Sequence, residues 1–180
     1  GAGEVTLTAN ASNILGDGGN GITMADVVID AGSGAVSLIA AGNNAGDIIV
    51  GQIVTTNDTD TSVTLNTASG IVDADASTGN DITSAGRLVI TSATGVGAAD
   101  ALDTEVVSID ITNEVSGDIN IVNTGDLVIQ KALQTAAGNI SISSSGNIQG
   151  FTDDGVADVS AETISLTAMA GGIGDVTALD

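Results

Sequence analysis

One short phrase returns along this chain about every 25 residues. In each copy, aliphatic residues alternate with small polar ones, and a glycine or asparagine beside another aliphatic residue follows shortly after. Copies begin at Val5, Val63, Leu88, Ile140 and Ile164. A fixed period of this size is typical of stacked repeat proteins, and the alternation indicates β-strands. The chain is therefore predicted to be a stack of short strands.

The composition favours a narrow interior filled by ladders of aliphatic side chains. Hydrophobic residues make up 42% of the 180 residues, unlike a typical disordered polymer, although there are 25 glycines. Phe151 is the only aromatic residue, and globular cores normally draw much of their buried area from aromatic side chains. The absence of proline agrees with inner strands that donate hydrogen bonds to neighbours on both sides.

Short strands separated by glycine corners account for most of the chain. We expect strands at 4–9, 26–30, 35–40, 47–55, 62–66, 87–91, 106–112, 118–122, 126–130, 139–143 and 163–167. Gly-Asp and Gly-Asn pairs between strands predict sharp turns, because these residues tolerate positive φ. No window shows sustained helical periodicity, and residues 131–137 come nearest to it.

These strands predict an all-β fold, a single-stranded parallel β-helix (β-solenoid) of about seven coils. Residues 1–180 would form one continuous solenoid domain, a segment of a longer chain. Leu65, Ile90, Ile142 and Leu166 are expected to face inward in equivalent positions. The alternative is an antiparallel β-sandwich, in which hairpins would join the same strands.

The charge and the lengths of the apolar stretches argue against nucleic-acid binding and membrane insertion. The net charge is −21, and Arg87 and Lys131 are the only cations. Nucleic-acid binding needs clustered basic residues, so it is not expected. No apolar stretch approaches the length of about 20 residues that a membrane span needs, so membrane insertion is not expected either.

Catalysis is not expected. The chain has no histidine or cysteine, which excludes Ser-His-Asp and Cys-His arrangements. Sugar-cleaving enzymes use paired carboxylates, and close pairs occur at 58/60, 73/75 and 153/154. The sequence offers these pairs no aromatic platform for a sugar. A β-helical enzyme acting on polysaccharides is therefore the least favoured of three functions.

Acidic loops are candidate calcium ligands. The candidates are Asp17 in a glycine-rich run, Asp58 and Asp60 in a protruding loop, and Asp153 with Asp154 in another. Calcium takes several carboxylate and carbonyl oxygens at close range. The alternative is that these acids were selected for turn geometry alone, and no cofactor is required by the fold.

The central passage resembles the repeats of giant bacterial surface proteins and filamentous-haemagglutinin-like adhesins. The resemblance covers about residues 60–180, and it is carried by Gly95-Val96-Gly97, Leu102-Asp103-Thr104, Thr112-Asn113, Gly117-Asp118-Ile119-Asn120-Ile121 and Asn123-Thr124-Gly125-Asp126-Leu127. Gly171-Gly172-Ile173-Gly174-Asp175 restarts the same phrase. This resemblance implies right-handed parallel β-helices that extend and display, at an extracellular or bacterial cell-surface location. Many relatives carry a proline where Ala101 stands here.

The expected function is that of a structural and adhesive repeat module of a secreted bacterial surface protein, forming a stiff rod or fibre. The alternative is a protomer of an extracellular filament whose copies stack end to end. Expected partners are neighbouring repeats or further copies of the chain, and a host or matrix surface.

Overall fold

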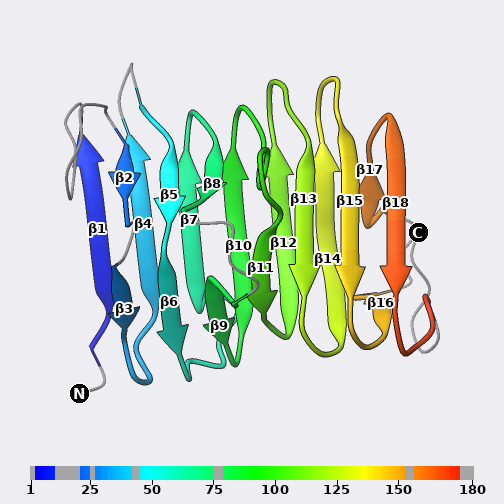
Figure 1. The fold of residues 1–180 in the computed structure, drawn as a ribbon, viewed down its shortest axis with the longest axis horizontal. Coiled ribbons are helices and arrows are strands. Elements are labelled where there is room, and N and C mark those ends of the chain that lie inside the picture. The colour runs from blue at the N-terminus through cyan, green and yellow to red at the C-terminus, as the bar shows by residue number, and fades with distance from the viewer. Residues whose placement is uncertain are drawn as a thin grey trace.

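The computed structural model describes residues 3–10, 21–24, 27–41, 45–74, 79–152 and 156–174. Within these residues the chain forms strands and no helix, and every strand pair is parallel. The parallel β-solenoid is therefore confirmed and the antiparallel sandwich is wrong. The coil makes about six turns, one fewer than predicted (Figure 1). Among the described residues, no helix has the length and apolar character needed to cross a membrane.

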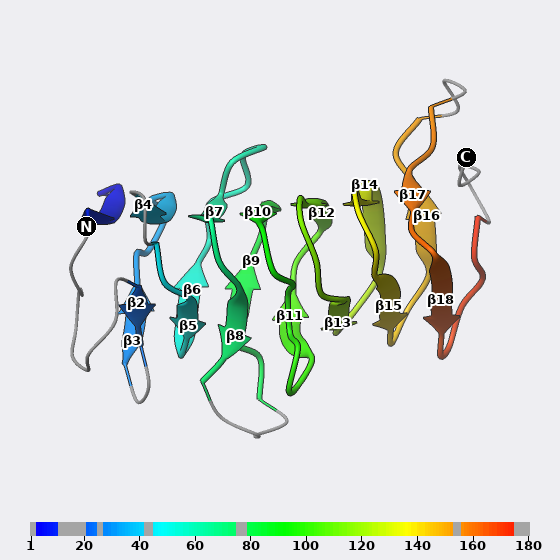
Figure 2. The same ribbon diagram turned by 90° about the horizontal axis from the view of Figure 1, so that it is seen from above.

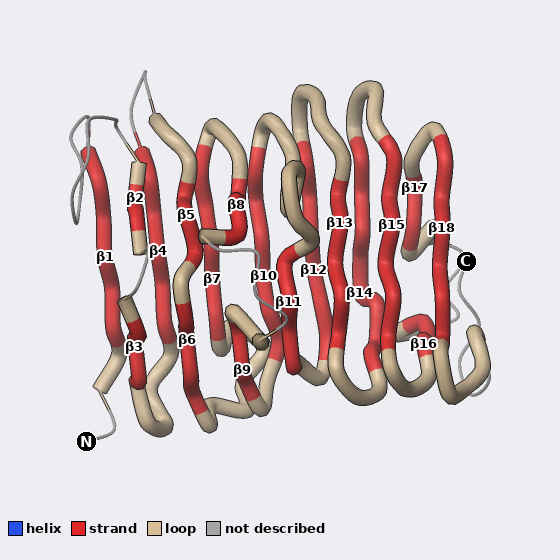
Figure 3. Tube along the Cα trace, in the orientation of Figure 1, coloured by secondary structure: helices blue, strands red, loops and turns tan. Residues whose placement is uncertain are grey.

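Three sheets run along the solenoid (Figures 1 and 3). The first sheet contains β1 (Val5–Asn10), β4 (Val36–Ala41), β7 (Val63–Thr67), β10 (Arg87–Ser92), β12 (Ser108–Asn113), β14 (Leu127–Gln134) and β16 (Ile148–Gly150), with β17 (Val159–Ser160) also pairing with β14. The second contains β3 (Val28–Asp30), β6 (Gln52–Thr55), β9 (Ile82–Ser84), β11 (Leu102–Glu105), β13 (Ile119–Asn123), β15 (Asn139–Ser144) and β18 (Thr163–Ala168). The third contains β2 (Ile22–Thr23), β5 (Ile48–Val50) and β8 (Ile71–Asp73).

The coils differ in length, and they become shorter in the middle of the chain. In the first sheet Val36 pairs with Val63, and Val63 pairs with Leu88, so these two coils lie close to the predicted period. Leu88 then pairs with Ile109, which is a shorter step along the chain than either of the two before it. The predicted period is therefore an average over unequal coils. Strand register, rather than a strict sequence repeat, keeps the aliphatic residues aligned.

The core consists of ladders in which aliphatic residues stack on like residues from one coil to the next. One ladder runs through Ile48, Ile71, Val96, Ile119 and Ile140, and all five are at most 1% exposed. The first and second sheets face each other across this interior (Figure 2). Side chains along each strand point alternately inward and outward, so every second residue of a strand contributes to the core.

The repeated phrase occurs in two different sheets, which corrects one prediction. Leu65 pairs with Ile90 in the first sheet, whereas Ile142 pairs with Leu166 in the second. All four side chains face the interior, but they belong to two ladders and not to equivalent positions. Leu65, Ile90 and Ile142 are buried, while Leu166 is half-buried because β18 is the last strand of its sheet.

Buried amides close the corner at which the first sheet ends. Asn113 lies between Ser92 and Gln134, which occupy the matching positions one coil before and one coil after it. Its side-chain oxygen accepts hydrogen bonds from the Ser92 hydroxyl and the Gly95 amide, each at 3.0 Å. Its Nδ2 donates to the Gln134 Oε1 at 2.9 Å. The backbone N–H of Gly95, which lies beyond the end of β10, thereby gains a buried acceptor.

Candidate functional site

The structure places two of the five calcium candidates. Asp17, Asp153 and Asp154 lie outside the described residues. Asp58 and Asp60 lie in the loop between β6 and β7, as predicted, and this loop projects from the outer face of the first sheet (Figure 2). Within the described parts of the chain, no three acidic residues converge in a way that could hold a metal ion.

Asp60 already has a cationic partner. Arg87 Nη2 on β10 donates to Asp60 Oδ1 at 2.8 Å, and the Asp60 side chain is 86% exposed. A guanidinium group beside this carboxylate opposes the binding of a second cation. Calcium binding at Asp58 and Asp60 therefore stays a prediction, and this ion pair weighs against it.

We expect sodium and calcium to act differently on this chain only if the acidic loops bind calcium. At a net charge of −21, screening by any salt reduces repulsion between molecules and increases light scattering. The measurement compares light scattering and thermal melting in sodium chloride and calcium chloride at equal ionic strength. Specific sites predict a higher melting temperature in calcium, whereas superimposable curves would leave screening as the whole effect.

Other acidic residues link one coil to the next. The backbone N–H of Asn139 donates to Asp118 Oδ1 at 2.7 Å, across 21 residues. Asn147 donates in the same way to Asp126 Oδ1, also at 2.7 Å and across 21 residues. The Gly-Asp and Gly-Asn pairs thus form the corners and also tie successive corners together. Gly117 and Gly125 take φ values of 85° and 94°, which side-chain-bearing residues rarely adopt.

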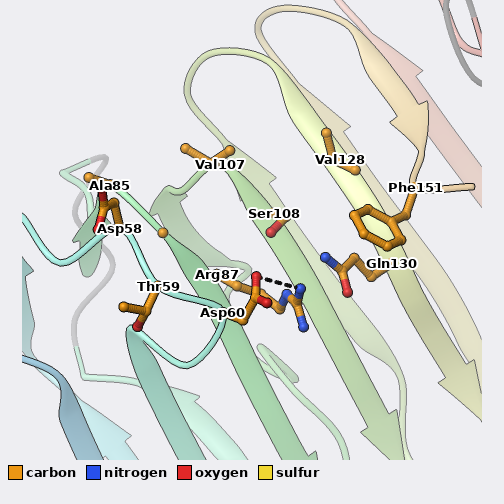
Figure 4. Close-up of a pocket in the computed structure, with 11 residues that line it drawn as sticks. Asp58, Thr59, Asp60, Ala85, Arg87, Val107, Ser108, Val128, Gln130 and Phe151 are labelled. Atoms are coloured by element: carbon orange, nitrogen blue, oxygen red, sulfur yellow. Dashed lines mark hydrogen bonds and ion pairs between the residues drawn. The ribbon is translucent and has the colours of Figure 1, made fainter.

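A groove on the outer face of the first sheet contains the only aromatic residue of the chain, Phe151, and one of its two cations, Arg87 (Figure 4). Its volume is about 230 Å³. The lining residues are Asp58, Thr59, Asp60, Ala85, Gly86, Arg87, Val107, Ser108, Val128, Gln130 and Phe151. They come from five successive coils, so the groove crosses the strands and runs along the solenoid.

The two ends of the groove differ in chemistry. At one end, the Arg87–Asp60 ion pair joins β10 to the projecting loop. At the other end, Phe151 follows β16 and lies beside Gln130 of β14, with Ser108 between the two ends (Figure 4). Phe151 is 52% exposed. A second hollow of about 440 Å³ shares Ala85, Val107 and Val128 with the groove.

β14 contains a β-bulge at Gln130, one of the residues that line the groove. Ile109 pairs with Ile129, but the next residue, Asp110, pairs with Lys131, so Gln130 is the extra residue. Gln130 and Lys131 are both half-buried, which breaks the alternation between buried and exposed positions. Lys131 Nζ lies 3.0 Å from Asp110 Oδ1. The bulge therefore sets Lys131 beside Asp110 on the neighbouring strand, while Gln130 keeps the outward position that follows Val128.

The sequence did not reveal this groove. Arg87, Gln130 and Phe151 are far apart in the chain and belong to no shared motif. The one available signal was that the only aromatic residue comes shortly before a predicted protruding loop, and this signal alone does not indicate a site. No family model, curated protein or solved structure matches the chain.

Proposed function

We propose that this chain is a structural and adhesive repeat module of a secreted bacterial surface protein, in which stacked coils form a stiff rod. The observation that carries the proposal is the continuous ladder of parallel pairs through about six turns. At roughly 4.8 Å for each turn, the coils account for roughly 30 Å of rod. Such a unit adds length without a hinge, because each coil is paired with its neighbours along two long sheets.

The last coil supports continuation of the rod. Ile164 pairs with Ile140, and Ile173 pairs with Ile148, so both extend ladders of the core. Ile140 and Ile148 are at most 1% exposed, whereas Ile164 and Ile173 are 45% and 48% exposed. A further coil stacked on β18 would bury them and pair the edge of that strand that has no partner among the described residues.

A chain that carries two copies in tandem tests the rod. X-ray scattering should show a particle about 30 Å longer than the single copy, with the same cross-section, because the second copy continues the stack. Negative-stain electron microscopy should show straight particles. Two bodies joined at variable angles would contradict a continuous rod.

The same uncovered coil favours the second function, a protomer of an extracellular filament. At the opposite end, β1 and β3 are the first strands of their sheets. Val5 and Leu7 of β1 are only half-buried, although the residues with which they pair in β4 are fully buried. Apolar side chains at both ends allow one copy to stack on the next.

Electron microscopy of the single copy at high concentration tests the filament. Filaments should form, and Ile164→Lys should prevent them, because the lysine would place a charge in the contact. Val115→Lys is the matched control, since Val115 is 61% exposed on a corner away from the end coil. A chain that stays monomeric would exclude the filament and leave the displayed rod standing.

A further inference from the structure

We propose that the groove between Arg87 and Phe151 binds a neutral glycan chain. In this site the ring of Phe151 packs against the C–H face of a sugar, and Arg87 with Gln130 forms hydrogen bonds to its oxygens. Glycan binding depends on the groove alone, so the rod proposal and the glycan proposal can be disproved independently.

The environment of Phe151 is the first reason. A phenylalanine that is 52% exposed leaves much of a ring uncovered, and here the ring stands beside a primary amide (Figure 4). A pyranose has an apolar face of C–H groups and a rim of hydroxyl groups. An exposed ring next to an amide that can both donate and accept matches these two surfaces. The ring gives contact area, and the amide gives orientation.

The hydrogen-bonding state of Arg87 is the second reason. Its side chain is only 15% exposed, and its one hydrogen bond within the described structure joins Nη2 to Asp60. The guanidinium group has five N–H donors, and Nε is buried with no partner. Nη1 has no partner among the described residues and is not buried, so an incoming oxygen in the groove can accept from it, whereas the buried Nε is out of reach. Asp60 fixes the guanidinium plane and can itself accept from a hydroxyl.

Charge restricts the glycan to a neutral one. The groove is lined by two carboxylates, Asp58 and Asp60, against the single cation Arg87. The adjoining hollow adds Glu105 and Asp126. Together with the net charge of −21, these groups repel uronate or sulfate chains. Hydroxyl groups interact with the same carboxylates favourably, as hydrogen-bond donors.

The shape of the groove suits an extended chain that lies along the solenoid. Arg87, Ser108 and Val128 are matching positions on three successive strands, and Phe151 follows the next one. Neighbouring strands are about 4.8 Å apart, close to the length of one sugar unit in an extended glycan. Successive units can therefore meet successive coils.

Electrophoresis in native gels that contain a polysaccharide tests the proposal, and it detects weak binding. The neutral polymers are dextran, galactomannan, xylan and laminarin, and alginate is the acidic comparison. The protein should be retarded by at least one neutral polymer and not by alginate. Phe151→Ala should weaken the association by about three- to tenfold, the range expected for loss of one aromatic contact. Gln130→Ala should weaken it as well.

Matched variants separate the groove from the rest of the surface. Met169→Ala removes an exposed apolar side chain on the end coil, and Gln52→Ala removes an exposed glutamine on the second sheet. Both should bind like the unmodified chain, and all four variants should keep its melting temperature within a few degrees. Three results would each overturn the proposal. They are migration that no neutral polymer changes, retardation of Phe151→Ala equal to that of the unmodified chain, and retardation by alginate alone.

Discussion

Replacing Ile142 with aspartate is expected to lower the free energy of unfolding by on the order of 5 kcal/mol. Ile142 is 1% exposed, and it stacks between Ile121 and Leu166 in the second sheet. A carboxylate in that ladder would lose its hydration and find no cation, since Arg87 and Lys131 both lie on the first sheet. Part of the chain population should unfold at room temperature, because a loss of this size approaches the whole stability of many domains.

Thermal and urea unfolding followed by circular dichroism measure this effect. Ser141→Asp is the control, because Ser141 is the exposed neighbour of Ile142 in the same strand. That change should alter the stability by no more than about 0.5 kcal/mol. If Ile142→Asp melts together with Ser141→Asp, the inward orientation of this ladder is wrong.

The local pattern was sufficient to predict the fold. Alternation within 139–143 anticipated β15 almost to the residue, because one side of that strand is buried and the other is exposed. The predicted strand at 47–55 is instead two strands, β5 and β6, separated at Gly51. A Cβ at Gly51 would collide with the carbonyl oxygen of Met24 in the preceding coil. This corner depends on a contact between coils, which a local pattern does not contain.

Register between coils could not be predicted in the same way. The phrases at Leu88 and Ile140 look alike, yet β10 lies in the first sheet and β15 in the second. Either sheet needs the same alternation of aliphatic and polar residues, so the phrase does not identify its sheet. Because the coils are also unequal in length, a strand cannot be assigned to its sheet by counting from one copy to the next.

The groove depends on the same unpredictable register. Arg87 meets Asp60 across 27 residues, and Phe151 lies beside Gln130 because Ile129 of β14 pairs with Gly150 of β16. From the sequence, Arg87 is an isolated charge at the start of a strand and Phe151 is an isolated aromatic residue. Stacking of four coils turns them into one surface. The acidic loop at Asp58 and Asp60 was recognised as a protruding loop, but its ion pair was not.

Replacing Asn113 with alanine is expected to lower the free energy of unfolding by about 4 kcal/mol, because several buried groups would lose partners together. Asn113 is fully buried, and its oxygen accepts from Ser92 and from the Gly95 backbone. Its Nδ2 lies within hydrogen-bonding distance of three oxygens, those of the Ser116 and Gly117 carbonyls and of the Gln134 side chain. Water cannot replace these bonds unless the corner opens.

Two further variants show whether the bonds or the packing matter. Asn66→Ala is the matched control, since Asn66 is exposed on β7, and it should change the stability by no more than about 0.5 kcal/mol. Asn113→Asp keeps the volume and the acceptor but sets a carboxylate against the three oxygens that Nδ2 now serves. It should therefore destabilise the chain at least as much as Asn113→Ala at neutral pH. If urea unfolding finds Asn113→Asp close to the unmodified chain, the corner depends on side-chain volume, and the amide ladder does not hold the coils together.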